Sequence, residues 1–303
     1  MTITDRSFTN SDREYHLIKG LLSEVEAYAD VDNNWDTGRM DWWRYNVHAE
    51  KAVDFFRENA HYWITDTDRV GGLFISEYGG DDFFFVVHPG FSALAPEVLK
   101  WGQGIWGQGK TKISTSVFIH DRQKVEQLMA AGFREDGHES NVRMYSLRRY
   151  DFSYDLMPGC RMLTFQEYGD YNSRVKLVQD AFGNPSYSEA RLRSLQRSPG
   201  YQPGLDLVVV NLEGESVGYC MGWIEENDPM AGYIEPMGTR TDYRRKGLGT
   251  ALAKECFRRL YDMGVVEVSI ASAAEPDISN FLYESLGPIR TTRAYRYSWT
   301  RTA

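Results

Sequence analysis

The two halves of this 303-residue chain repeat one order of predicted elements, which limits the fold more than any single motif. Valine-rich and alternating runs predict strands, and apolar ladders at four-residue spacing predict helices. In the second half the predicted elements are the strand Arg161–Phe165, the helices Tyr168–Phe182 and Ser188–Arg197, the strands Leu205–Asn211, Ser216–Ile224 and Gly232–Thr239, a helix from Gly247 to about Asp262, the strand Val265–Ala271, the helix Asp277–Leu286 and the strand Arg293–Thr300. In the first half they are the helix Asp12–Ala27, the strands Tyr62–Thr65, Val70–Glu77 and Asp82–His88, the helix Ala95–Trp101, the strand Lys112–Ile119, the helix Arg122–Ala131 and the strand Asn141–Leu147.

The spacing within the two series supports an internal duplication. From Val86 to Gly132 the chain advances 46 positions, and from Met237 to Gly287 it advances 50. Each stretch leads from a strand to a glycine at the end of a helix. We therefore predict two domains, residues 1–150 and 151–303, with two unrelated α/β halves as the alternative.

Composition narrows the class of protein. With 42% hydrophobic and 25% charged residues, the chain has the make-up of a soluble globular protein. No apolar run approaches the ~20 residues that a membrane span needs, and the first ten residues are too polar for a signal peptide. Three cysteines without CxxC spacing argue against a disulfide framework or a zinc site, so we expect a cytoplasmic protein with no metal and no membrane partner.

The charge is acidic and the histidines are unevenly placed. A net charge of −9 disfavours nucleic acid as a partner and mildly favours cationic small molecules. All six histidines lie in the first half: His16, His48, His61, His88, His120 and His138. Chemistry housed in the second half must therefore run without histidine.

Residues Arg244 to Thr250 join a predicted strand to the long helix of the second half. Backbone N–H groups at a helix N-terminus lack intrahelical partners and together carry about half a positive charge. Gly247 and Gly249 remove the Cβ atoms that would keep an anion away from those amides, and three basic residues open the stretch. The stretch predicts a phosphate site, with a solvated basic helix start as the alternative.

A second glycine-rich stretch, Gly104 to Thr111, matches the GxxxxGK[ST] pattern of nucleotide-binding loops. That pattern cradles phosphate when a strand precedes it and a helix follows it. Here the predicted order is reversed, and the large Trp106 would crowd a backbone cradle. We interpret the stretch as a helix-to-strand connection, with nucleotide hydrolysis as the alternative.

Arg244-x-x-Gly247-x-Gly249 is similar to the (Q/R)xxGx(G/A) signature of the GNAT superfamily, the acetyl-CoA-dependent N-acetyltransferases. Together with the run from Asn280 to Gly287, it resembles the core of that family over roughly residues 161–299. The first half resembles the same fold with its cofactor loop lost. His88 to Leu94 stands where the loop should follow the strand, and Leu128 occupies the tyrosine position.

The resemblance implies an α/β (α+β) fold of two tandem GNAT-like domains, each a mixed, mostly antiparallel central sheet flanked by helices. It implies that the first domain is degenerate and serves as structure or shapes the substrate site. The second domain would bind acetyl-CoA and carry the catalysis.

The resemblance also implies where acetyl-CoA binds. The two middle strands splay apart and leave backbone groups for the pantetheine arm at Met237, Gly238 and Thr239. The pyrophosphate rests on the loop residues Arg244, Arg245, Lys246, Gly247, Leu248, Gly249 and Thr250. Asn280 matches a position that contacts the cofactor, with a capping role as the alternative.

For catalysis, the resemblance places Tyr283 near the CoA sulfur, where it would act as general acid. Glu235, on the cofactor strand, is the candidate base, directly or through a water. The alternatives are a packed aromatic and a structural carboxylate. Because a positioned acid or base contributes ~10²–10⁴-fold, the loss of either should be measurable without being absolute.

The resemblance does not identify the acceptor. In this fold the early helices and last strands shape its site, here Phe182–Tyr187 and Pro288–Tyr295. The acidic and aromatic residues favour a small-molecule amine, and a peptide amine or a hydroxyl acceptor stays open. The alternative function is a non-catalytic acyl-CoA-binding sensor or scaffold.

Overall fold

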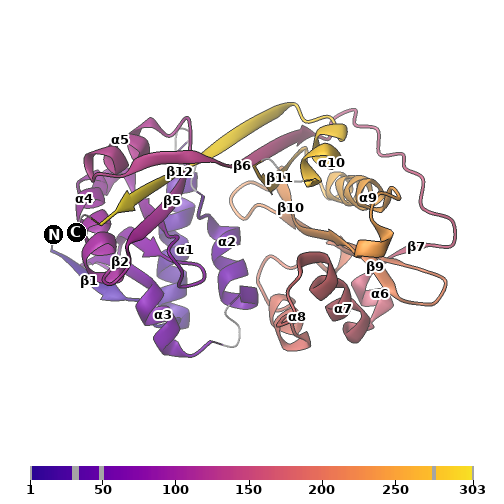
Figure 1. Cartoon of the computed structure of the whole chain (residues 1–303), viewed down its shortest axis with the longest axis horizontal. Helices are drawn as coiled ribbons and strands as arrows, with labels where there is room; N and C mark the ends of the chain where they lie inside the picture. The colour runs from indigo at the N-terminus through magenta and orange to yellow at the C-terminus, as the bar shows by residue number, and fades with distance from the viewer. Residues whose placement is uncertain (1, 29–33, 48–50, 275–277, 302–303) are drawn as a thin grey trace. The chain divides into compact units, whose positions relative to one another are not determined.

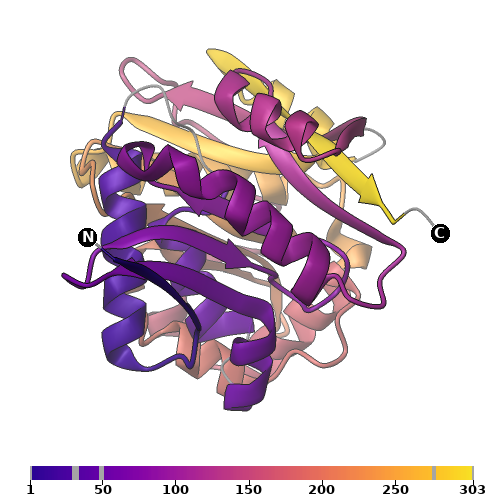
Figure 2. The same ribbon diagram turned by 90° about the vertical axis from the view of Figure 1, so that its left-hand side faces the viewer.

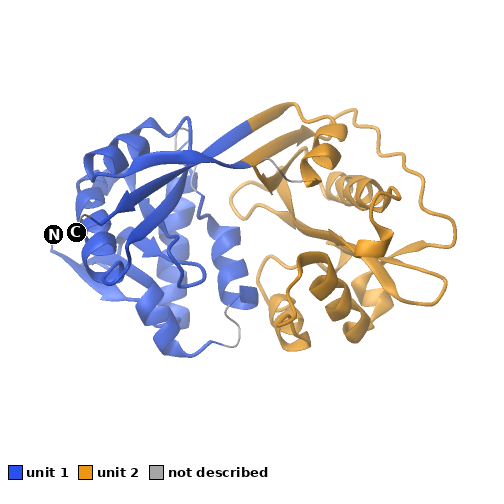
Figure 3. Cartoon of the chain, in the orientation of Figure 1, with its two compact units in different colours: residues 1–140, 292–303 blue, residues 141–291 orange. Residues whose placement is uncertain are grey.

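The computed structural model describes residues 2–28, 34–47, 51–274 and 278–301. Its contacts divide the chain into two compact units (Figure 3), residues 1–140 with 292–303 and residues 141–291. The sequence predicts one cut after residue 150 instead. The difference arises because the end of the chain pairs with a strand of the first unit.

Unit 1, shown in blue in Figure 3, alternates strands and helices. Its elements are β1 Ile3–Ser7, α1 Asp12–Glu26, α2 Thr37–Trp42, η1 Trp43–Val47, α3 Val53–Asn59, β2 Ala60–Thr65, β3 Val70–Ile75, β4 Phe84–Val87, η2 Pro89–Leu94, α4 Ala95–Trp101, η3 Gly102–Trp106, β5 Lys112–Phe118 and α5 Arg122–Ala130. Two further strands, β6 Arg134–Ser146 and β12 Arg290–Thr300, have residues in both units.

Unit 2, shown in orange, has the corresponding series. Its elements are β7 Arg161–Thr164, α6 Phe165–Tyr168, α7 Tyr171–Phe182, α8 Glu189–Leu195, η4 Pro203–Leu205, β8 Asp206–Val210, β9 Ser216–Ile224, β10 Ala231–Thr239, η5 Thr241–Tyr243, α9 Leu248–Asp262, β11 Glu267–Ala273 and α10 Ser279–Ser285.

The main sheet of unit 1 is antiparallel, in the order β1-β2-β3-β4, and α1 and α4 cover its two faces (Figure 2). Successive strand residues point to opposite faces, so each strand feeds two cores. Leu73 packs in the core that contains α1, and Phe74 packs in the core that contains α4.

The C-terminal strand completes unit 1. Residues 294–300 of β12 pair antiparallel with residues 112–118 of β5, from Ala294 opposite Phe118 to Thr300 opposite Lys112. A segment from the end of the chain therefore supplies hydrogen bonds to a strand that lies about 180 positions earlier.

Unit 2 is built on strands in the order β6-β11-β10-β9-β8-β7 (Figure 1). The alternation along β9 shows which helices cover each face. Tyr219 contacts Phe182 of α7, while the next residue, Cys220, lies in the core with Leu252 and Cys256 of α9. α7 and α9 thus lie on opposite faces of the sheet.

The order and type of the predicted elements are confirmed in both units. The predicted helix Tyr168–Phe182 is two helices, because Gly169 adopts φ +69° and ends α6 before Asp170 caps α7. The strand predicted to begin at Asn141 begins at Arg134. Strand β1 and helices α2 and α3 are not among the predicted elements. Asp277, the predicted start of the last helix, lies outside the described residues. In the described parts of the chain, we find no helix with the length and apolarity to cross a bilayer.

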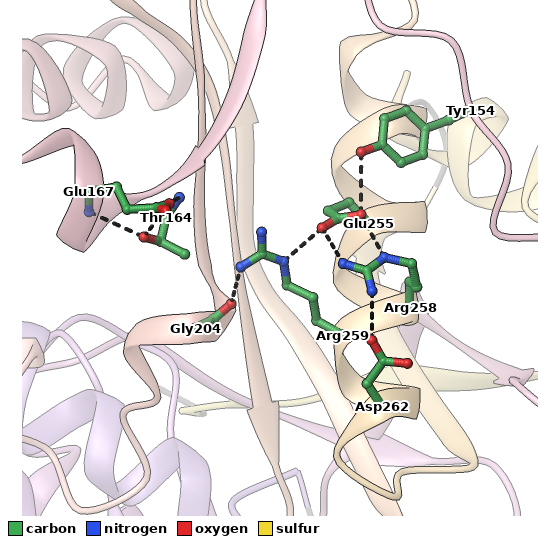
Figure 4. A network of polar contacts seen from close by, with 8 residues as sticks. All are labelled: Tyr154, Thr164, Glu167, Gly204, Glu255, Arg258, Arg259 and Asp262. Carbon is green, nitrogen blue, oxygen red and sulfur yellow. Dashed lines mark hydrogen bonds and ion pairs between the residues drawn. The ribbon is translucent and has the colours of Figure 1, made fainter.

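A network of polar contacts holds α9 against the rest of unit 2 (Figure 4). The Glu255 carboxylate accepts hydrogen bonds from Arg258 and Arg259 at 2.8 Å and from the Tyr154 hydroxyl at 3.3 Å. Arg259 also donates to the carbonyl oxygen of Gly204, before β8. These contacts position α9, whose N-terminus is the predicted phosphate site.

Candidate functional site

The strands β10 and β11 diverge, as the resemblance to the GNAT superfamily implies. Their parallel pairing runs from Ala231 and Glu267 to Tyr233 and Ser269. Beyond Tyr233, β10 continues to Thr239 paired with β9 alone in the register that the structure shows. From residue 234 onward, the edge of β10 that faces β11 is therefore without a paired strand in the register described. Its main-chain groups can hydrogen-bond an extended ligand there.

The loop that follows β10 has the backbone conformation of an anion-binding turn. Arg245 and Gly247 both adopt left-handed conformations, at φ +60° and +80°. Gly247 is the N-cap of α9 and has no side chain to satisfy the first helical amides. Among the described residues, the amides of residues 245–250 donate no hydrogen bond to a protein acceptor. A run of such amides at the start of a fifteen-residue helix favours a phosphate group.

Gly249 permits a close approach between α9 and α10. A Cβ atom at Gly249 would lie 2.8 Å from Cδ2 of Leu282, inside the van der Waals limit. A Cβ atom at Gly238 would lie 3.0 Å from Ala181 and from Phe182. Both glycines therefore set helix positions around the site.

The three basic residues of the loop differ in their contacts. Arg244 reaches back into the protein, donating to the carbonyl oxygens of Thr239 at 3.4 Å and Ala181 at 3.0 Å. Arg245 is exposed, and the Lys246 ammonium lies 4.9 Å from the ring centre of Tyr243. All three side chains are exposed, and the geometry suits Arg244 to holding the loop in place.

Asn280 is buried in a polar cluster that joins α10 to β11 and β6. Its Oδ1 accepts hydrogen bonds from Arg143 and Ser272, both at 2.8 Å, and its Nδ2 donates to the carbonyl oxygen of Ala273. Arg143 also donates to Glu284 on α10. These contacts suit Asn280 to positioning α10.

The two predicted catalytic residues lie in different environments. Tyr283 is 8% exposed and packs in the core beside α9, with Tyr145 donating to its carbonyl oxygen at 2.8 Å. Glu235 is exposed on β10, two positions beyond the last parallel pair. Its carbonyl oxygen accepts a hydrogen bond from the indole of Trp223. Glu235 therefore lies where β10 and β11 begin to separate.

A buried ion pair lies on the α7 face of the sheet, and the sequence did not single it out. Arg174 and Asp206 are each 1% exposed and 3.0 Å apart, and the Tyr201 hydroxyl donates to the same carboxylate. The Arg174 guanidinium stacks 3.6 Å from the centre of the Tyr219 ring. Burial raises the pKa of Asp206, although Arg174 opposes the shift. In the sequence, the one signal of this ion pair is an arginine within the apolar stripe of a predicted helix.

The nucleotide-loop pattern in unit 1 has the structural order that the sequence predicts. Gly102–Trp106 extends α4, and β5 follows at Lys112. The indole of Trp106 donates to Asn59, and Lys110 donates to the carbonyl oxygen of Gly80. The stretch connects a helix to a strand and lacks the strand-to-helix turn of a phosphate loop.

Comparisons with known proteins agree with this geometry. Residues 173–287 match the model of the acetyltransferase (GNAT) family. A GCN5-related N-acetyltransferase from Sphaerobacter thermophilus is similar in structure, with a TM-score of 0.65 and 20% identity over 98% of this chain and 95% of that one. A tandem GNAT protein from the clavulanic acid biosynthesis pathway has a TM-score of 0.68 and 14% identity over 100% and 99%. An acetyltransferase of the GNAT family from Colwellia psychrerythraea has a TM-score of 0.61 and 9% identity over 99% and 100%. No match to a curated protein was found.

The family match covers the part of unit 2 that contains the loop, the diverging strands and α10. The structural matches extend over both units. Residues 173–287 therefore match the GNAT family, and the chain as a whole has the fold of a tandem GNAT protein.

Proposed function

We propose that unit 2 transfers an acetyl group from acetyl-CoA to the amine of a small molecule, by direct attack in a ternary complex. The observation that carries this proposal is the run of amides at residues 245–250, which donate to no protein acceptor in the described chain and lie next to the diverging edge of β10. Acetyl-CoA would supply the activated acetyl thioester.

The residues present fit the donor. The pyrophosphate would accept hydrogen bonds from the amides of Arg245, Lys246, Gly247, Leu248, Gly249 and Thr250, with the Thr250 hydroxyl beside them. Met237, Gly238 and Thr239 would hold the pantetheine arm through main-chain groups. In this proposal Asn280 serves the site by positioning α10, because its amide already binds Arg143, Ser272 and the carbonyl oxygen of Ala273.

Two side chains would handle the protons of the reaction. Glu235, which is exposed on β10, would take a proton from the attacking amine, directly or through a water. Tyr283 would give a proton to the departing thiolate. This assignment agrees with the absence of histidine from residues 141–291.

The surroundings of Glu235 favour a cationic acceptor. The ring of Tyr233, on the same strand as Glu235, stacks with that of Trp223 on the neighbouring strand β9, with their centres 6.1 Å apart. Aromatic faces attract alkylammonium groups, and a carboxylate adds a charge of opposite sign. A small amine with a second positive charge is therefore our proposed acceptor class.

A matched pair of substitutions tests the donor site. Gly247 has a left-handed backbone and open space around its Cα, and asparagine and aspartate both tolerate that conformation. Gly247→Asp places a negative charge against the pyrophosphate, whereas Gly247→Asn has nearly the same shape without the charge. By calorimetry with acetyl-CoA, we expect Gly247→Asp to bind about tenfold or more weakly than Gly247→Asn. Equal affinities of the two variants would show that the loop does not bind the pyrophosphate.

Turnover is tested separately from binding. Purified protein with acetyl-CoA and a panel of diamines, monoamines and alcohols should release CoA, with the diamines fastest. Tight acetyl-CoA binding without CoA release from any acceptor would favour the non-catalytic acyl-CoA sensor.

A further inference from the structure

Unit 1 retains a strand divergence like the one in unit 2. Asp82, two residues before β4, forms an isolated parallel bridge with Ser114 of β5. Beyond it, β4 pairs with β3 on its other side, and β5 pairs with β12. The carboxyl ends of β4 and β5 therefore border a gap inside unit 1.

A pocket of about 270 Å³ lies beside the carboxyl end of β4. It is lined from β4, from the turn after β4, and from the start of α5. The lining residues are Phe85, Val87, Pro89, Ser92, His120, Asp121, Arg122, Gln123, Lys124 and Gln127. All of them belong to unit 1.

The pocket lacks the parts that would hold a pyrophosphate. Pro89, at the position of the loop, has no N–H group to donate. The next amide, of Gly90, donates at 2.9 Å to Nδ1 of His88, so the protein itself caps this turn. The volume also lies just below the ~300–1,000 Å³ of sites for drug-sized ligands. The occupant is therefore smaller than CoA and lacks a diphosphate.

The lining has an apolar wall beside a cationic rim. Phe85 and Val87 form the wall, and the Lys124 ammonium lies 5.0 Å from the centre of the Phe85 ring. His120 and Arg122 line the same pocket. The single acidic residue in the lining, Asp121, accepts a hydrogen bond from the backbone amide of Lys124 and caps α5. Burial lowers the pKa of Lys124 to about 8, and the negative charge of Asp121 opposes this shift.

From this lining we propose that the pocket in unit 1 binds a small monocarboxylate with an aromatic or alkyl body. The carboxylate contacts Lys124, and the body packs against Phe85 and Val87. Unit 1 is then a ligand-binding domain with its own specificity, in addition to the donor site of unit 2.

A fluorinated probe set tests the proposal on the full chain by ¹⁹F NMR. The probes are 4-fluorobenzoate, neutral 4-fluorobenzamide and cationic 4-fluorobenzylamine, which share one ring. We expect saturable binding of the benzoate, about tenfold tighter than either of the others, since the charge-assisted contact is lost in both. Binding of the amide as tight as that of the benzoate would overturn the proposal.

Matched variants locate the binding. Lys124→Gln should weaken 4-fluorobenzoate about tenfold, and Lys124→Arg should keep most of the affinity. Lys112→Gln, which removes an exposed lysine of β5 outside the pocket, should have no effect. Undiminished binding in Lys124→Gln would overturn the assignment.

A third variant guards against misfolding of the Lys124 variants. Ser92 is an exposed lining residue, so Ser92→Phe narrows the pocket with little cost to the core. It should abolish benzoate binding while the Gly247→Asp variant of unit 2 keeps it. The reverse pattern would place the benzoate in unit 2 and refute the proposal.

Discussion

Arg244 donates a hydrogen bond from its guanidinium to the carbonyl oxygen of Ala181, 3.0 Å away near the end of α7. The arginine of the GNAT-like signature thus ties the loop before α9 to α7, which lies on the other face of the sheet from α9. Its neighbour Arg245 is also exposed, and in the proposed function it would act on the pyrophosphate through its charge.

This contrast predicts different salt dependences for two substitutions. Arg244→Gln should weaken acetyl-CoA binding at low and high salt alike, since it loosens the loop. Arg245→Gln should weaken binding at low salt only, because a Debye length of ~3 Å at 1 M salt screens an exposed charge. Calorimetric titrations at 0.05 and 1 M NaCl measure both. Parallel salt curves would contradict the positioning role of Arg244.

The contact between Gly249 and Leu282 predicts a coupled pair. Gly249→Val should move Leu282 and lower the free energy of unfolding by about 1–3 kcal/mol, because added carbons overfill a packed site. Adding Leu282→Ala should recover part of that loss, with a coupling energy of about 1 kcal/mol in a double-mutant cycle. Urea denaturation of the four proteins measures it, and strict additivity would show that Leu282 does not limit position 249.

Tyr283→Phe separates a proton donor from a packed ring. The ring keeps its place in the core, so the melting temperature should change little, while kcat falls ~10²-fold or more. The matched control is Tyr145→Phe, which removes the hydroxyl that donates to the carbonyl oxygen of Tyr283. It should cost about 1 kcal/mol of stability with a much smaller effect on kcat. Equal kcat values in the two variants would leave Tyr283 a structural residue.

The Glu255 network predicts a pH-dependent stability. Burial opposes ionisation of Glu255, but hydrogen bonds from Arg258 and Arg259 outweigh it and lower its pKa below the usual 4.5. Its folded pKa therefore lies below its unfolded one, and the stabilisation is complete above about pH 4.5 and is lost as the pH falls through the folded pKa.

At pH 7, Glu255→Gln should be about 1–3 kcal/mol less stable than the parent chain. The difference should shrink as the pH drops below about 4.5. Urea denaturation at pH 7 and pH 3.5 measures it, with the exposed Glu213→Gln as control. A deficit that stays constant over this range would mean that the charge of Glu255 contributes nothing.

Prediction from the sequence succeeded where local patterns decide the structure. The strands β8 to β10 are apolar runs broken by turns, and the helix α9 has a four-residue ladder, so both were placed within a few residues. The contacts of the loop depend on residues far away in the chain. The tie from Arg244 to Ala181 joins positions 63 residues apart, and the cluster around Asn280 includes Arg143, 137 residues away. A local sequence pattern does not indicate such distant pairs, which is why these contacts and the Arg174–Asp206 pair were not predicted. The cofactor-binding roles of Arg244 and Asn280 stay predictions.

The pairing of β12 with β5 has a consequence for how the protein is made. Synthesis proceeds from the N-terminus, so β5 waits without this partner until residues 294–300 have left the ribosome. Unit 1 therefore reaches its final form only after unit 2 has been translated, although it comes first in the gene. A premature stop near residue 291 would leave every residue of unit 2 in place and remove from unit 1 the strand that pairs with β5.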